Sequence, residues 1–290
     1  MIKMNELPPD WQRNEFMGLN VAKDRAVHQI LDNPKIFEDP LALRIIGADV
    51  ESRLRLSLAQ FDKPEQRGFR AAFMVRNRCA EDELASAVQK GARQFVILGA
   101  GLDTFAYRNP FPCLRVFEVD HPATQAWKRS CLEKAAIPVP ASVTYVAVDF
   151  QQQAITGALR QSGFQNDQLT FISLIGVVRY LSHEAFISVL TSIASSMSAG
   201  SEVVFDFAPP PSQFQRLRDL ADRVVVKRTW KGSDFHPSYF GLESLTRDLK
   251  RIGFANVQLL GPTEMNLRYC NGRTDGLRIR NQMHLVKARV

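Results

Sequence analysis

The chain has 290 residues, of which 45% are hydrophobic and 23% charged, and its formal net charge is +7. These values are typical of a globular protein, and no apolar run approaches the roughly 18 residues that a membrane-spanning helix needs. The polar start, residues 1–14, lacks the basic-then-apolar order of a secretion signal, so we expect a cytoplasmic protein without a membrane partner.

The basic residues and the cysteines are both scattered. Because no run of five basic residues occurs, we expect no nucleic-acid partner, and a weakly basic surface suits an acidic small-molecule substrate. No Cys-x-x-Cys pair occurs, so neither a metal site nor a redox motif is predicted. We expect free thiols at all four cysteines, which are Cys79, Cys113, Cys131 and Cys270. The oligomeric state stays open.

Residues 15–90 are predicted to be mostly helical. Apolar residues recur there at helical spacing, namely Leu19, Ala22, Ala26 and Ile30. Asn33-Pro34 is expected to break this helix, and Asp39-Pro40 to begin another. A long amphipathic helix is predicted over Glu65–Lys90, ending at Gly91.

From residue 94 the pattern changes to short continuous apolar runs separated by helical or polar segments. Such runs are typical of buried parallel strands in an α/β sheet. We expect five of them, at Phe95–Leu98, Leu114–Val119, Val143–Val148, Leu169–Ile175 and Glu202–Phe207. Ser182 is a suitable N-cap for a helix over His183–Met197.

The end of the chain is predicted to complete the same sheet. A helix is expected at Leu242–Ile252, followed by strands at Ala255–Leu260 and Met283–Ala288. No convincing helical pattern lies between these two strands, so the last strand is expected to be antiparallel.

We expect a single domain over residues 1–290. It comprises an N-terminal helical cap (1–91), a cofactor-binding core (92–211), an insert (212–240) and the rest of the sheet (241–290). The charged insert contains Gly232, His236 and Pro237, and it is either a surface excursion or a lid over the substrate.

A glycine loop, Gly99-Ala100-Gly101, follows the first predicted strand. Ligands of open α/β sheets bind beyond the carboxyl ends of the strands, where glycines allow close approach of the backbone. A dinucleotide motif requires a third glycine at position 104, which is Thr104 here, and Asp103 would repel a pyrophosphate. S-adenosylmethionine has no phosphate and carries a cationic sulfonium, so this loop favours it, with Asp103 beside it.

Acidic residues follow the next two strands. Asp120 ends the second strand and could accept hydrogen bonds from both ribose hydroxyls, although a dinucleotide enzyme could use it likewise. Asp149 ends the third strand and could accept from the adenine amino group, while Phe150 packs on the ring. Each aspartate alone is also a common turn residue. Upstream, the guanidinium of Arg76 suits bidentate binding of the cofactor's carboxylate, or simply lies in solvent.

These segments together resemble the leucine carboxyl methyltransferase family, and more narrowly its bacterial branch of S-adenosylmethionine-dependent methyltransferases. The resemblance spans nearly the whole chain, and its most specific part is the combination of the segments at 94–108 and 117–122. The matching segments read QFVILGAGLDTFAYR (94–108), FEVDHP (117–122), VAVD (146–149), GVVRYL (176–181), AKDRA (22–26) and GRTDGLR (272–278).

The resemblance implies an α/β fold of the Rossmann-like class I methyltransferase type. This fold has a mostly parallel seven-stranded sheet, helices on both faces and, here, an N-terminal helical cap. It also implies cofactor contacts, at Arg76, Gly99, Asp120, Asp149 and Phe150, and Lys23 resembles a lysine that helps the arginine in some members. One departure is that many relatives carry a glutamate just before the segment that begins at Gly176, where this chain has Ser173-Leu174-Ile175.

Methyl transfer requires alignment of nucleophile, methyl group and leaving sulfur more than it requires acid–base chemistry. A substrate carboxylate is already ionised at neutral pH, whereas a phenol or alcohol usually needs a general base. We therefore expect an O-methyltransferase acting on a carboxylate or acidic oxygen of a small molecule. Candidate substrate residues are Arg179, Tyr180 and His121, each of which could also have only a structural role.

Three other functions remain open at this stage. The chain could methylate the C-terminal carboxylate of a protein, as the family's namesake does, or it could bind the cofactor without catalysis. A dehydrogenase is the least supported, because Thr104 interrupts the dinucleotide motif.

Overall fold

The computed structural model describes residues 9–149, 155–210 and 239–290. Its centre is one seven-stranded sheet in the order β3-β2-β1-β4-β5-β7-β6. The strands are β1 (Gln94–Leu98), β2 (Arg115–Asp120), β3 (Val143–Ala147), β4 (Thr170–Leu174), β5 (Glu202–Phe207), β6 (Ala255–Leu260) and β7 (His284–Arg289). Strands β1 to β5 pair in parallel, and β7 runs antiparallel between β5 and β6. This topology confirms the predicted class I methyltransferase fold and its antiparallel last strand.

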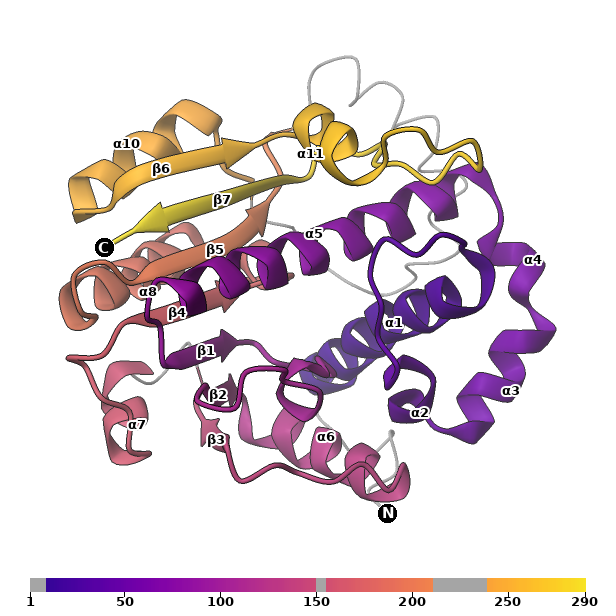
Figure 1. Ribbon diagram of the computed structural model, residues 1–290, viewed down its shortest axis with the longest axis horizontal. Helices are drawn as coiled ribbons and strands as arrows, with labels where there is room; N and C mark the ends of the chain where they lie inside the picture. Colours follow the sequence, from indigo (N-terminus) through magenta and orange to yellow (C-terminus); the bar gives the residue numbers. More distant parts are fainter. Residues whose placement is uncertain (1–8, 150–154, 211–238) are drawn as a thin grey trace.

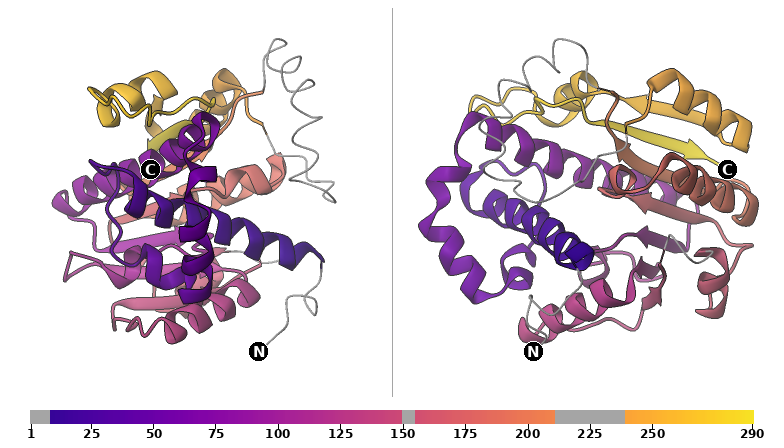
Figure 2. Two further views of the ribbon diagram at one scale, coloured as in Figure 1. Left: turned by 90° about the vertical axis from the view of Figure 1, so that its right-hand side faces the viewer. Right: turned by 180° about the vertical axis from the view of Figure 1, so that it is seen from behind.

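Helices cover both faces of the sheet. They are α1 (Pro9–Leu31), α2 (Ala42–Ile46), α3 (Ala48–Leu56), α4 (Leu58–Phe61), α5 (Pro64–Gln89), α6 (Pro122–Lys134), α7 (Ile155–Gln161), α8 (His183–Ser196), α10 (Leu242–Ile252) and α11 (Pro262–Tyr269). Helix α5 crosses one face (Figure 1), and α8 and α10 cover the other, as the view from behind shows (Figure 2). Every residue of β1, β4 and β5 is therefore buried, which is why these strands read as continuous apolar runs.

Two predicted helix boundaries are confirmed by their capping contacts. The Ser182 hydroxyl accepts a hydrogen bond from the Ala185 amide at 3.1 Å, so Ser182 is the N-cap of α8. Helix α5 begins with Pro64 in its first turn and is followed by Gly91 at φ +108°, the left-handed conformation that commonly ends helices.

The prediction that no helix lies between the last two strands was wrong, because α11 occupies this connection. Pro262 lies in its first turn, and the Glu264 carboxylate accepts a hydrogen bond from the Gly261 amide at 3.1 Å. Met265 is its one fully buried residue, so the helix shows no repeated apolar spacing. Capping, rather than periodicity, was the signal that could have revealed it.

The N-terminal helices α1 to α4 gather beside the carboxyl ends of the parallel strands, toward which the arrows of β1 and β4 point in Figure 1. The predicted apolar stripe of α1 is confirmed, since Ala22 and Ala26 are fully buried against α2. The cap therefore lies at the edge of the sheet where ligands of this fold bind.

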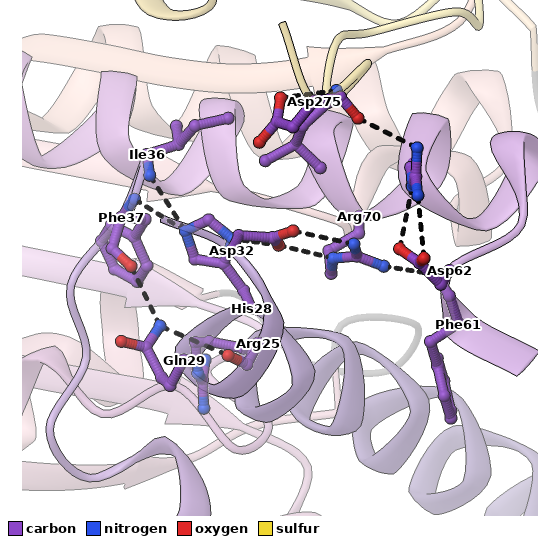
Figure 3. A network of polar contacts seen from close by, with 12 residues as sticks. Arg25, His28, Gln29, Asp32, Ile36, Phe37, Phe61, Asp62, Arg70 and Asp275 are labelled. Atoms are coloured by element: carbon purple, nitrogen blue, oxygen red, sulfur yellow. Dashed lines mark hydrogen bonds and ion pairs between the residues drawn. The ribbon is translucent and has the colours of Figure 1, made fainter. Parts of the chain in front are cut away.

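A buried polar network ties α1 to α5 (Figure 3). Arg70 donates two hydrogen bonds to Asp32, at 2.6 and 2.9 Å. His28 Nδ1 lies 2.7 Å from Asp32, while its Nε2 accepts from the amides of Ile36 and Phe37. This network gives His28 a structural role, and it fixes α1 on the helix that carries Arg76.

Most of the predicted insert, 212–240, including His236, lies outside the described residues. The described end of the insert includes Phe240, which is buried against Phe186 with ring centroids 5.0 Å apart. Among the described helices, none combines the length and apolar character needed to cross a membrane.

Candidate cofactor site

The glycine loop after β1 has a backbone that other residues rarely adopt. Gly99 has φ +71° and Gly101 has φ +42°. A Cβ on Gly99 would lie 2.4 Å from Cγ2 of Val177, which follows β4. Gly99 therefore allows the turns after β1 and β4 to approach each other closely at the carboxyl edge of the sheet.

The residues after this loop are held by the N-terminal cap. The Asp39 carboxylate accepts from the Thr104 hydroxyl at 2.7 Å and forms an ion pair with Arg25, also at 2.7 Å. Arg25 also donates to the Leu102 carbonyl at 2.6 Å. Asp103 closes the turn, since its carboxylate accepts from the Phe105 amide at 2.7 Å. The predicted cofactor residue Asp103 is thus bonded within the loop, and the predicted cofactor residue Ala100 is buried.

Asp120 joins the ends of β1 and β2. Its carboxylate accepts hydrogen bonds from the Gly101 amide at 2.6 Å and from the His121 amide at 2.7 Å. Burial raises the pKa of Asp120, and these two amides oppose that shift. The acid predicted to bind the ribose is therefore beside the glycine loop, as the sequence spacing indicated.

His121 serves as the N-cap of α6, because its Nδ1 accepts from the Ala123 amide at 3.2 Å. Burial lowers the pKa of His121, while the nearby carboxylate of Asp149 opposes the shift. The structure thus brings Asp120, His121 and the half-buried Asp149 together at the ends of β2 and β3. Phe150, the predicted adenine contact, lies outside the described residues.

Arg76 lies on α5 with only 6% of its surface exposed. Its Nη1 donates to the Asp206 carboxylate at 2.9 Å, and its guanidinium lies 4.6 Å from the Phe73 ring centroid. Its Nε is buried and has no hydrogen-bond partner among the described residues. A buried donor without a partner is costly in a folded protein, so the Nε of Arg76 calls for a partner that the described residues do not supply.

Asp206, on β5, is a site residue that the sequence analysis missed. Its second oxygen accepts from the Gly176 amide at 2.5 Å. Gly176 has φ +76°, and a Cβ there would lie 2.9 Å from Nη2 of Arg76. The chain thus lacks a glutamate on β4 before Gly176 but brings a carboxylate to Gly176 from the neighbouring strand. The available signal in the sequence was Asp206 itself, an acid inside the apolar run Glu202–Phe207.

Helix α1 carries two charged residues, Lys23 and Asp24, and Asp24 lies within electrostatic range of Arg76. Burial and the nearby Arg53 lower the pKa of the predicted cofactor residue Lys23. Asp24, which the sequence analysis did not single out, is half-buried, and its Oδ1 is buried without a partner among the described residues. Burial raises the pKa of Asp24 to about 7, although the cations of Arg70 and Arg76 oppose the shift.

The predicted substrate residues Arg179 and Tyr180 lie in a short 3-10 helix after β4, Val178–Tyr180. Arg179 is exposed, and its guanidinium lies 5.8 Å from the Tyr180 ring centroid. Burial raises the pKa of Tyr180, and the charges of Arg76 and Asp206 also act on it. Tyr180 is therefore close to the Arg76–Asp206 pair, at the same edge of the sheet as the glycine loop.

The residues present fit S-adenosylmethionine. Asp120 can accept from ribose hydroxyls beside a glycine loop with no Cβ in the way, and Arg76 has a buried donor suited to a carboxylate. The acids of this edge, including Asp103 and Asp206, suit a cationic ligand better than a pyrophosphate. When bound, this cofactor supplies an activated methyl group.

Comparisons with known proteins show which family and fold the chain resembles. The model of the leucine carboxyl methyltransferase family matches residues 18–194. A Bacillus subtilis protein named "Putative S-adenosyl-L-methionine-dependent methyltransferase YktD" is 31% identical over 288 residues, covering 91% of this chain and 94% of the relative. A similarly named Mycobacteroides abscessus protein is 33% identical over 212 residues, covering 72% of this chain and 70% of that protein. A DUF574 family protein of Streptomyces avermitilis shares the fold, with a TM-score of 0.53 at 14% identity, over 85% of this chain and 94% of that one.

Proposed function

Because the chain belongs to the leucine carboxyl methyltransferase family and is an S-adenosylmethionine-dependent methyltransferase, we propose that its methyl acceptor is a carboxylate or another acidic oxygen of a small molecule. The observation that supports this proposal most directly is the placement of Arg179 and Tyr180. Both follow β4, and Tyr180 is close to Arg76 and Asp206.

Arg179 and Tyr180 have the chemistry to bind an anionic acceptor. The exposed guanidinium of Arg179 can donate two parallel hydrogen bonds to a carboxylate. Tyr180 has a raised pKa, so its hydroxyl keeps its proton at neutral pH and can donate a further hydrogen bond. Together they would orient an acceptor oxygen at the cofactor edge.

A carboxylate acceptor needs no general base, and this agrees with the environment of the nearby His121. His121 uses Nδ1 to cap α6, and burial lowers its pKa. The bound cofactor would supply its methyl group to an oxygen that is already ionised, with its sulfur as the leaving group, so the protein would need to move no proton. The products are a methyl ester and a thioether, and the protein contributes mainly alignment, which can supply on the order of 7–11 kcal/mol.

Methyl transfer from methyl-labelled S-adenosylmethionine to a panel of carboxylic acids and matched phenols tests the proposal. We expect label in the acids and its release as methanol in mild alkali, because esters hydrolyse and aryl ethers do not. Arg179→Ala should raise KM for the acids about 10-fold or more with a smaller change in kcat. Arg247→Ala removes an exposed arginine of α10 and serves as the control. Alkali-stable label, or transfer to phenols alone, would contradict the proposal.

The family's description favours a second candidate, the C-terminal carboxylate of a protein. Peptides that end in a free leucine carboxylate, with the amidated peptides as controls, belong in the same panel. Transfer to the free peptides but not to small acids would select this candidate.

A further inference from the structure

Two charged side chains, Arg76 and Asp206, meet beside Gly176, and a third, Asp24, lies within electrostatic range of Arg76. Arg76 comes from α5, Asp206 from β5 and Asp24 from α1, and the charge of Arg76 acts on both carboxylates. The two oxygens of Asp206 accept from Arg76 and from the Gly176 amide. By contrast, Asp24 Oδ1 is buried without a hydrogen-bond partner among the described residues, and so is Nε of Arg76.

The amino-acid end of S-adenosylmethionine carries one carboxylate and one ammonium, so it needs both a donor and an acceptor. We propose that Asp24 binds the cofactor's ammonium while Arg76 binds its carboxylate. This inference rests on the cofactor, not on the identity of the methyl acceptor.

The other cations around Asp24 do not use its buried oxygen. Arg70 donates from Nε and Nη2 to Asp32 and from Nη1 to the Phe61 carbonyl. Lys23 precedes Asp24 on α1 and is half-buried, and no bond joins the two side chains among the described contacts. An incoming ammonium is thus a fitting donor for Asp24, and it would offset the burial of the carboxylate.

Charge balance supports the same assignment. Arg76 is already neutralised by Asp206. A ligand carboxylate alone would add a negative charge beside Asp206 and Asp24, which electrostatic repulsion would disfavour. An ammonium on the ligand removes this excess when it pairs with Asp24.

Calorimetric titration with two ligands tests the proposal. One is S-adenosylhomocysteine, and the other is its 2-oxo acid analogue, in which a carbonyl oxygen replaces the ammonium. The wild-type chain should bind S-adenosylhomocysteine about 10-fold or more tightly than the analogue, because a charge-assisted hydrogen bond is lost. Asp24→Asn should weaken binding of S-adenosylhomocysteine by a similar factor and leave the analogue within about 3-fold.

The analogue separates ammonium binding from a merely structural role. Equal losses for both ligands, or no loss for S-adenosylhomocysteine, would overturn the proposal, and so would equal wild-type affinity for the two ligands. The comparison of the two ligands on the wild-type chain needs no variant. Asp49→Asn, an exposed aspartate of α3, is the matched control, and thermal melting checks folding. Because binding requires no methyl acceptor, failure here is distinguishable from failure of the proposed substrate class.

Discussion

The two ends of the proposed cofactor site are built in different ways. The proposed adenosine end comprises the glycine loop after β1, Asp120 at the end of β2 and Asp149 after β3, which are three consecutive strand ends. The proposed methionine end comprises Arg76, Asp206 and Asp24, which come from a helix on the sheet face, a strand and the cap. The first end follows from local order along the chain, whereas the second exists only after the cap has packed on the sheet.

The charged groups of the two ends are also stabilised in different ways. Asp120 is held by two backbone amides, which remain in place when a neighbouring side chain changes. Arg76 and Asp206 hold each other as a buried ion pair, so the loss of either leaves an uncompensated charge. Substitutions at the methionine end should therefore affect stability and binding together, while those at the adenosine end should affect mainly binding.

The largest effect is expected for Arg76→Ala. It leaves the buried Asp206 carboxylate without its cation, and we expect a loss of about 3–5 kcal/mol in the free energy of unfolding. Affinity for S-adenosylhomocysteine should fall on the order of 100-fold or more. Urea denaturation and calorimetric titration measure the two effects.

The control for this variant is Arg78→Ala, two residues along α5. Arg78 is exposed and pairs with Asp82 at the helix surface, so the change should cost less than about 1 kcal/mol. If Arg76→Ala were as mild as Arg78→Ala in both measurements, the two ends of the site would not differ as described.

The same contrast explains what the sequence could and could not predict. Buried strands read as apolar runs, and the fold gathers their carboxyl ends at one edge, so Asp120 and Asp149 could be placed from order alone. Asp206 and Asp24 are single acids whose importance depends on which element packs beside them. Helix α11 escaped prediction for a related reason, because its start depends on capping and buries little apolar surface.

Asp120→Asn tests the adenosine end and should have an intermediate effect. The amide oxygen can still accept from one backbone N–H, so the chain should stay folded. Loss of the charge should weaken S-adenosylhomocysteine binding about 10- to 100-fold. The contrasting variant is Asp103→Asn, whose oxygen can keep the bond from the Phe105 amide and should change affinity little. Equal losses for Asp120→Asn and Asp103→Asn would show that Asp103, and not only Asp120, contacts the cofactor.

The last expected effect concerns the pH dependence of stability at the proposed methionine end. Burial raises the pKa of Asp24 to about 7 in the folded chain, from about 4 in the unfolded chain. Between these values the folded state binds more protons, so the contribution of Asp24 to stability is fully present below pH 4 and is lost as pH rises toward 7.

Asp24→Asn removes this titration. Relative to the wild-type chain without ligand, the variant should gain on the order of 1–3 kcal/mol in the free energy of unfolding as pH rises from 5 to 8. Urea denaturation at several pH values measures this difference. Asp49→Asn, on the exposed surface of α3, is the matched control for the removal of one carboxylate. If Asp24→Asn ran parallel to the wild type, Asp24 would be ionised throughout, and the buried carboxylate would have a partner other than the cofactor.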